Sequence, residues 1–294
     1  MENGPIIVGG LDRSGKTPLC KMLGRHPRLA FTRRTYLWTR FYNRYGDLAQ
    51  PENLERCLQA MQKQSAIQAL QLDMERIRRE FGQGPATYAR LFELIHRQNA
   101  ERLGKPRWGD QLGLVERFAE TIFAAYPEAK MIHMVRDPRD RFAAAKMARK
   151  PGWKAGWSVA RWQYSARLAE LNRRRFPERY LVLRYESLVQ DPQKNLATIC
   201  DFLGETFDPC MLKPENRSEE DPDEREDPQV GHISTGEVAF VQLIAAKEMR
   251  RLEYGLEPVQ FSAGKAAAFT LVDLPLNLAG MMYWRLTEKK DFNG

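Results

Sequence analysis

A glycine-rich turn between an apolar segment and a helical segment is the feature that most constrains the fold of this chain. Residues 5–9 are rich in Ile and Val and bounded by glycines, which is typical of a buried strand. Residues 10–17 follow and fit the pattern G-x-x-x-x-G-K-[ST]. Leu19, Met22 and Leu23 then recur at helical spacing. In this order, a strand, a turn and a helix place backbone N–H groups where they can wrap a phosphate.

Two cations lie in the turn itself. Arg13 and Lys16 have no evident packing role in a turn that only connects a strand to a helix. Their positive charge adds to the partial positive charge at the N-terminus of the helix, which favours an anion. The first motif therefore indicates an anion site.

A second motif consists of an apolar segment that ends in an arginine. Residues 131–135 are typical of a buried strand, and residues 136–140 read Arg-Asp-Pro-Arg-Asp. Open α/β sheets bind ligands outside the carboxyl ends of their strands, so Arg136 is placed to meet such a ligand. Taken alone, the motif also fits a turn with an internal ion pair. Together with the first motif, it predicts one shared anion site.

Strand-like and helical segments alternate along the chain, which predicts an α/β fold with a parallel sheet. Strands are expected at residues 5–9, 29–31, 131–135 and 180–184, and helices at 53–81, 86–103, 114–126, 157–176 and 195–203. We expect a single domain over residues 1–260, with a central parallel sheet flanked by helices and a helical cap at about residues 50–104.

Residues 261–294 are expected to form a C-terminal packing extension. The apolar stretch 269–284 is interrupted by Asp273 and Pro275, and it is shorter than the roughly 20 residues of a spanning helix. The sequence therefore predicts no transmembrane segment, with contact at a membrane surface as a minor alternative.

Charge and cysteine content restrict the function only broadly. The net charge of +8 favours an anionic ligand or partner but does not separate a nucleotide, a nucleic acid, a sulfated glycan and a membrane surface. No nucleic-acid-binding module is recognisable, so no nucleic-acid partner is expected. The four cysteines have no metal-binding spacing, and the N-terminus lacks the pattern of a signal peptide. These features favour a cytoplasmic location.

Taken together, the motifs resemble those of the PAPS-dependent sulfotransferase family, where PAPS is 3′-phosphoadenosine 5′-phosphosulfate. The family motif Arg/Lys-Ser-Gly-Thr-Thr, which binds the 5′-phosphosulfate, is similar to residues 13–17. The family arginine that binds the 3′-phosphate corresponds to Arg136. Residues 107–110 resemble a Trp-Gly-Asp stretch of some members, and residues 180–191 resemble a strand and turn whose adenosine-contacting tyrosine corresponds to Tyr185. The resemblance covers residues 5 to about 207.

The resemblance implies a P-loop-like fold and an in-line transfer of a sulfuryl group from PAPS to a hydroxyl or amine, with PAP as the product and no metal. The acceptor would be a small molecule, a glycan or a lipid. The implied cofactor-binding residues are Arg13, Ser14, Gly15, Lys16, Thr17, Arg136 and Tyr185.

The catalytic groups follow from what sulfuryl transfer needs. Arg13 and Lys16 are placed to donate hydrogen bonds to the transferring and leaving oxygens. Asp110, at the end of a predicted strand between the motifs, is the leading candidate for the base that accepts the acceptor proton. Asp110 is equally suited to cap a helix that begins near Leu112. Asp12 is a weaker candidate for the base.

Departures from the family pattern keep two other functions open. Lys16 stands where the family has a threonine, Ala144 where it commonly has a serine on the 3′-phosphate, and Gln111 where many members have a catalytic lysine. Lys16 completes the pattern of a nucleotide kinase or NTPase, although Arg136 stands where that class needs an aspartate for Mg²⁺. Gln111 and Ala144 are also compatible with a PAPS- or PAP-binding protein that has lost catalysis.

Two further segments are compositionally distinct. Residues 33–45 interleave four arginines with aromatic residues, which fits either an anionic acceptor or single-stranded nucleic acid, or aromatics that pack under the cap. We favour packing under the cap. Residues 215–227 are strongly acidic, and we assign them no chemistry.

Overall fold

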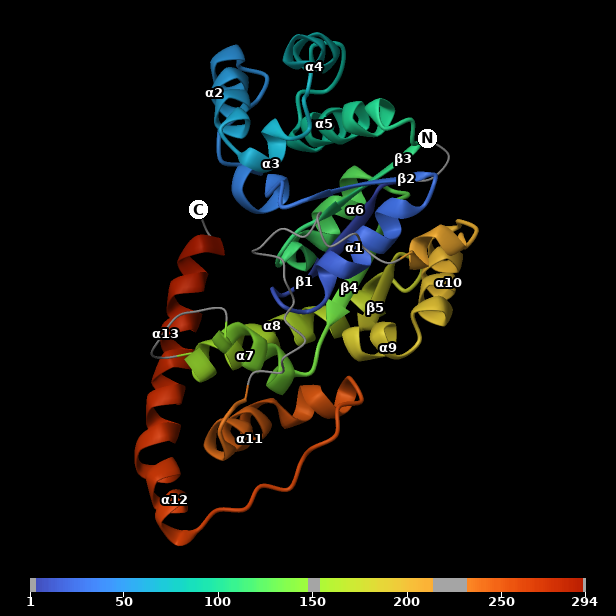
Figure 1. The fold of residues 1–294 in the computed structure, drawn as a ribbon. Helices are drawn as coiled ribbons and strands as arrows, with labels where there is room; N and C mark the ends of the chain where they lie inside the picture. Colours follow the sequence, from blue (N-terminus) through green and yellow to red (C-terminus); the bar gives the residue numbers. More distant parts are fainter. Residues whose placement is uncertain (1–3, 148–153, 214–231, 293–294) are drawn as a thin grey trace.

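Five parallel strands form the centre of the molecule (Figure 1). The computed structural model describes residues 4–147, 154–213 and 232–292, so the acidic segment 215–227 lies outside the described residues. The strands are β1 (Ile6–Gly10), β2 (Leu29–Arg33), β3 (Arg107–Gln111), β4 (Lys130–Val135) and β5 (Tyr180–Arg184). Their order is β2-β3-β1-β4-β5, and every neighbouring pair is parallel. The carboxyl ends of all five strands therefore meet at one edge, as the sequence predicted.

Successive side chains of β1 point to opposite faces of the sheet, and each face is covered by a different set of helices. Ile6 and Val8 pack with α1, α9 and α10, whereas Ile7 packs with α5 and α6. His133 of β4 lies on the same face as Ile7 and contacts Ser165 of α8. The helices are α1 (Lys16–Arg25), α5 (Tyr88–Arg102), α6 (Ala119–Ala125), α8 (Lys154–Arg175), α9 (Tyr185–Gln190) and α10 (Pro192–Leu203).

A helical cap stands above the sheet in Figure 1, close to the predicted position. It contains α2 (Pro51–Gln62), α3 (Ser65–Gln68), α4 (Met74–Phe81) and α5. The prediction of one continuous helix over residues 53–81 is wrong. Gln71 has a positive φ of 50°, which ends helical geometry, and the side chain of Asp73 caps α4 by accepting a hydrogen bond from the N–H of Arg76 at 2.9 Å.

The aromatic residues that follow β2 pack beneath this cap. Trp38, in the π-helical turn η1 (Leu37–Phe41), is 1% exposed. Its ring lies 5.3 Å from that of Phe92 in α5, in an edge-to-face arrangement that aromatic pairs favour. The packing explanation for the aromatic part of residues 33–45 is thus confirmed.

A third group of helices lies at the end of the molecule opposite the cap (Figure 1). Here α7 (Pro138–Met147) and α11 (Thr235–Arg251) pack with α8. The chain then continues through α12 (Ala263–Ala268), the π-helical turn η6 (Phe269–Asp273) and α13 (Leu274–Phe292) as one helix along the side of the molecule.

Asp273 and Pro275 interrupt the apolar composition of this C-terminal segment, but the helix continues through both residues. Proline lacks the N–H of an ordinary helical residue and clashes with the preceding turn. The π-helical turn η6 ends two residues before Pro275, and π-turns occur where a helix departs from the regular hydrogen-bond pattern. Among the described residues, Ala263–Thr287 is consequently one helix that is long and apolar enough to cross a membrane, by length and composition alone.

Candidate functional site

The glycine-rich turn forms a loop between β1 and α1 whose backbone depends on positive φ angles. Gly10 has a φ of 115°, Arg13 of 63° and Gly15 of 87°. The hydroxyl of Ser14 donates a 2.7 Å hydrogen bond to the carbonyl oxygen of Leu11, which closes the turn. No described side chain caps the N-terminus of α1. The partial positive charge of that terminus is therefore offered to whatever the loop holds.

Lys16 is folded back into this loop. It is 6% exposed, and its Nζ donates to the carbonyl oxygen of Gly10 at 2.8 Å and to that of Leu11. Burial lowers the pKa of Lys16 to about 8, against the charges of Asp12 and Glu116, which raise it. Lys16 is thus a buried ammonium group whose charge is sensitive to a neighbouring anion.

Arg136, at the carboxyl end of β4, reaches the same loop. Its Nη1 donates to the carbonyl oxygen of Arg13 at 3.3 Å, and its guanidinium lies 4.5 Å from the ring centre of Tyr185. Its Nε is buried and has no hydrogen-bond partner among the described residues. A buried donor without a partner is costly, and an anion at this point would satisfy it. The two sequence motifs therefore converge on one place, as predicted.

Tyr185, at the start of α9, packs directly on the loop. A Cβ atom added to Gly15 would lie 2.1 Å from Cδ2 of Tyr185, so no other residue fits between the loop and this ring. The positive φ of Gly15 independently disfavours a side chain there. Gly15 and Tyr185, both predicted site residues, are thus fitted to each other. Thr17, in the first turn of α1, is partly exposed.

Sequence reasoning missed two arginines behind the loop. Nη2 of Arg141 in α7 and Nη2 of Arg161 in α8 each lie 3.3 Å from Oδ1 of Asp12. Arg141 is 2% exposed and also donates to the carbonyl oxygen of Asp12 at 3.1 Å and to the hydroxyl of Ser158. Asp12 is consequently an ion-paired anchor of the loop. No sequence pattern predicts the ion pairs of Asp12, because Arg141 and Arg161 are far from Asp12 in the sequence and meet it only in the folded chain.

A buried carboxylate was missed as well. Glu116, in the short 3₁₀ turn η2 (Val115–Phe118), accepts the N–H of Gly10 at 3.0 Å and the hydroxyl of Ser165 at 2.7 Å. His133 lies 3.6 Å from it and contacts the hydroxyl of Tyr180 at 2.6 Å. Burial raises the pKa of Glu116, but His133 and the hydrogen bonds from Ser165 and Gly10 bring it below its ordinary value. The network supports the base of the loop.

Asp110 lies inside the sheet, near the carboxyl end of β3. It is fully buried, accepts a 2.8 Å hydrogen bond from the hydroxyl of Thr32 and another from that of Thr35, and lies 3.4 Å from Nε2 of His96. It does not cap a helix, because the next helical turn, η2, begins at Val115 and has Leu114 as its N-cap residue. Across the described ranges, no three His, Cys, Asp or Glu side chains are grouped to hold a metal ion.

Gln111 and Ala144, two residues that differ from the family pattern, lie on different elements of the fold. Gln111, the last residue of β3, is 7% exposed, and its Oε1 has no hydrogen-bond partner among the described residues. Ala144, in α7, is partly exposed and brings no hydroxyl to the site. In this chain the anion site therefore depends on the loop and Arg136.

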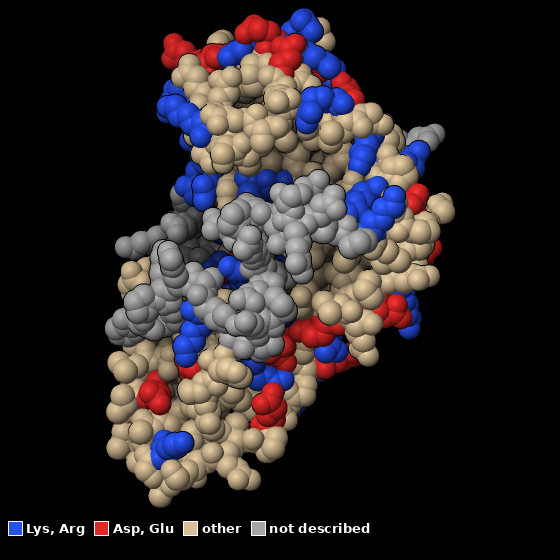
Figure 2. All heavy atoms as spheres, in the orientation of Figure 1, with Lys and Arg blue, Asp and Glu red and all other residues tan. Residues whose placement is uncertain are grey.

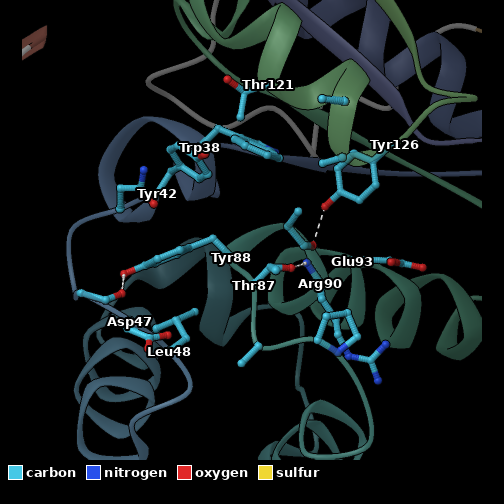
Figure 3. Close-up of a pocket in the computed structure, with 17 residues that line it drawn as sticks. Trp38, Tyr42, Asp47, Leu48, Thr87, Tyr88, Arg90, Glu93, Thr121 and Tyr126 are labelled. Atoms are coloured by element: carbon cyan, nitrogen blue, oxygen red, sulfur yellow. Dashed lines mark hydrogen bonds between the residues drawn. The ribbon is translucent and has the colours of Figure 1, made fainter.

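A cavity of about 830 Å³ lies beneath the cap, between η1, α5 and α6 (Figure 3). Its walls carry aromatic side chains, and the hydroxyl of Tyr126 at one wall donates to the carbonyl oxygen of Ala89. Neither the loop 10–17 nor Arg136 contributes to its lining. The cavity is therefore separate from the anion site. Lys and Arg atoms lie along the lower edge of the cap in Figure 2.

A single family model matches the part of the chain that contains the loop 10–17, Arg136 and Tyr185. The family model described as "Sulfotransferase family" matches residues 5–209, more than half of the chain. Sulfotransferase 2A1 of Macaca fascicularis is 28% identical over 112 residues, a match that covers 33% of this chain and 39% of that protein.

Solved structures share the fold over most of the chain. The sulfotransferase domain of the Synechococcus PCC 7002 olefin synthase has a TM-score of 0.57 and 23% identity, and covers 87% of this chain and 96% of that one. The sulfotransferase domain from the curacin biosynthetic pathway has a TM-score of 0.55 and 19% identity, and covers 87% and 99%. At these identities the likeness establishes the P-loop-like fold.

Replacing Gly15 by alanine will disrupt the site. Gly104 is the matched control, since it has a φ of 66° but nothing within 4 Å of an added Cβ. Gly104→Ala should cost about 1–2 kcal/mol of unfolding free energy from backbone strain alone. Gly15→Ala should cost more and should weaken anion binding, because Tyr185 must move. Thermal unfolding and calorimetry will measure both. Equal losses of stability with intact anion binding would contradict the fit between Gly15 and Tyr185.

Anion binding at the loop will weaken as the pH rises through about 8, where the free protein loses the Lys16 proton. Linkage limits the decline to about tenfold per pH unit. Adenosine 5′-phosphosulfate is a suitable ligand for calorimetry, because its charge is constant over this range. Lys16→Arg keeps its charge and should show no such decline. If the variant declines like the wild type, another group titrates.

Proposed function

Because this chain belongs to the sulfotransferase family, we propose that it transfers a sulfuryl group from PAPS to a hydroxyl or amine of an acceptor. The observation that carries the proposal is the convergence of Arg136 on the loop, within 3.3 Å of the Arg13 carbonyl oxygen. One cation at a loop fits many anions. Here a loop after one strand and an arginine after a second strand both pack against the ring of Tyr185. This arrangement fits a nucleotide that carries phosphate groups on both the 3′ and the 5′ position of its ribose.

The residues present suit such a donor. Residues 13–17 would hold the 5′-phosphosulfate through loop N–H groups and the N-terminus of α1. Arg136, whose buried Nε has no described partner, would hold the 3′-phosphate. The ring of Tyr185 would lie against the adenosine. When bound, the donor supplies an activated sulfuryl group on a phosphate leaving group.

Arg13 and Lys16 would stabilise charge on the transferring and leaving oxygens. In-line transfer forms a bond from the acceptor oxygen or nitrogen to sulfur while the bond from sulfur to the bridging oxygen breaks. Negative charge then builds on the leaving phosphate, next to the loop. A buried ammonium group such as Lys16 acts strongly there, because little water competes for the charge. No metal is needed for this step.

Asp110 remains our candidate for the base that accepts the acceptor proton. Its complete burial means that the proton would reach it through the hydroxyl of Thr35 or through His96, which lies 3.4 Å away. We propose small molecules, glycans or lipids as the acceptor class. A cytoplasmic location is supported by the four cysteines, because none of them forms a disulfide in the described structure.

Arg136→Ala will separate the nucleotides that this site could bind. Loss of charge-assisted hydrogen bonds to the 3′-phosphate should cost about 1.5–3 kcal/mol, or about 10- to 150-fold in affinity for PAPS. The loss should nearly vanish for adenosine 5′-phosphosulfate, which lacks that phosphate. Dissociation constants for both ligands, with circular dichroism to confirm folding, provide the measurement. Equal losses would mean that Arg136 is structural, and Mg²⁺-dependent ATP hydrolysis would favour an NTPase instead.

Asp110→Asn will test the base. Turnover should fall at least about 100-fold while PAPS binding is retained, because general-base catalysis contributes on that scale. Thr32→Val is the control, since it removes one hydrogen bond to Asp110 and keeps the carboxylate. Unfolding temperatures will show how much each change disturbs the sheet. Similar turnover losses in both variants would assign Asp110 a positioning role.

A further inference from the structure

The C-terminal helix carries a broad apolar surface that nothing in the described structure covers. Between 40% and 75% of each large apolar side chain on this surface is exposed. These residues are Leu271, Val272, Leu276, Leu278, Met282, Tyr283 and Leu286. Within α13, Leu278, Met282 and Leu286 recur at spacings of four, and Leu276 and Tyr283 are seven apart, so all five lie on about one half of the helix circumference. We call this surface the outer face.

The outer face carries few charges along its length. Asp273 is the single charged residue between Lys265 and Arg285. Asp273 is exposed, and its Oδ2 lies on the side of the helix that faces α11, since a Cβ added to Gly236 would lie 3.4 Å from it. The exposed Lys265 and Arg285 thus lie near the two ends of a largely uncharged surface. In Figure 2, the part of the molecule that contains α12 and the lower half of α13 is correspondingly poor in charged atoms.

The opposite side of the helix is fixed to the body of the protein. Met281 and Trp284 are each 4% exposed and pack in the cluster formed with α8. The N–H of Gly156 in α8 donates to Oδ1 of Asn277 at 3.1 Å, and a Cβ on Gly156 would lie only 1.9 Å from the Asn277 carbonyl oxygen. The two helices therefore touch backbone to backbone. The outer face is presented rigidly and not by a free tail.

We propose that the outer face lies in the plane of an anionic lipid bilayer and inserts its apolar side chains among the acyl chains. Ala263–Thr287 has 25 residues, or about 37 Å of helix, which gives a long line of contact. Lys265 and Arg285 would lie at the level of the headgroups, where basic side chains are attracted to anionic lipid. Tyr283, 61% exposed, would place its hydroxyl at the same boundary.

Charge distinguishes a lipid surface from a second copy of the chain as the occupant. Two outer faces paired antiparallel would bring Lys265 against Arg285, and parallel pairing would bring each cation against its own copy. Both arrangements oppose like charges at the ends of the interface. An anionic bilayer instead complements Lys265 and Arg285, and beyond Arg285 Lys289 and Lys290 offset the charges of Glu288 and Asp291. The contact with α8 likewise favours a helix lying in the membrane surface over one that leaves the protein to span it.

Vesicle sedimentation of the full chain will test the proposal. The wild type should bind vesicles that contain phosphatidylserine and bind pure phosphatidylcholine more weakly. Leu278→Glu with Met282→Glu should lower the partition coefficient at least about tenfold, because each change replaces inserted apolar surface by a charge. Leu171→Glu is the matched control: Leu171 is 57% exposed on α8, outside the outer face, and its variant should bind like the wild type.

Other outcomes would overturn the proposal. If the double variant binds vesicles like the wild type, the outer face is not the contact. Lipid-free light scattering that shows a wild-type dimer and a monomeric double variant would identify a second copy as the occupant. Retention of the wild type in membranes after alkaline carbonate extraction would mean that the helix spans. Circular dichroism and PAPS binding will confirm that the variants are folded, independently of transfer activity.

Discussion

Glu116, a carboxylate with 1% exposure, holds the part of the molecule on which the anion site depends. It accepts the N–H of Gly10, at the point where β1 becomes the loop, and the hydroxyl of Ser165 in α8. Through His133 it is coupled to β4 and, through Tyr180, to β5. A buried carboxylate is tolerable only with such partners, so the network has to form as a whole. The position of the loop relative to Arg136 follows from it.

The sequence predicted the site residues that lie at the ends of apolar strands, and it missed those that lie on distant helices and turns. Arg136 was predictable only together with the glycine-rich loop, because both follow apolar strands whose carboxyl ends meet at one edge of a parallel sheet. Glu116, Arg141 and Arg161 were not predictable, since each meets the loop only after distant elements have packed. A buried charge in a helix or turn carries no local signature. Asp110 was found by its place in a motif, but its partners Thr32 and Thr35 were not.

The elements of the fold were likewise predicted well where their local sequence pattern is clear and poorly where it is not. Strands β1, β4 and β5 are apolar runs and were placed to within a residue, whereas β3 contains Arg107 and Asp110 and lacks that signal. The helical pattern of residues 53–81 concealed two breaks, because apolar side chains on both sides of a break can still face the same core. The C-terminal helix was underestimated for the opposite reason: a local rule against proline yields where a π-turn precedes it.

The order of the strands has a consequence for how the molecule acquires its site. β1 is the first strand to be synthesised, yet Ile6 pairs with Gly109 on one side and with Lys130 on the other. Contacts so distant in sequence are slow to form, since a long loop must close before they return any free energy. Tyr185 reaches the loop later still. A nascent chain therefore lacks the complete candidate anion site until β5 and α9 have docked on the strands made before them.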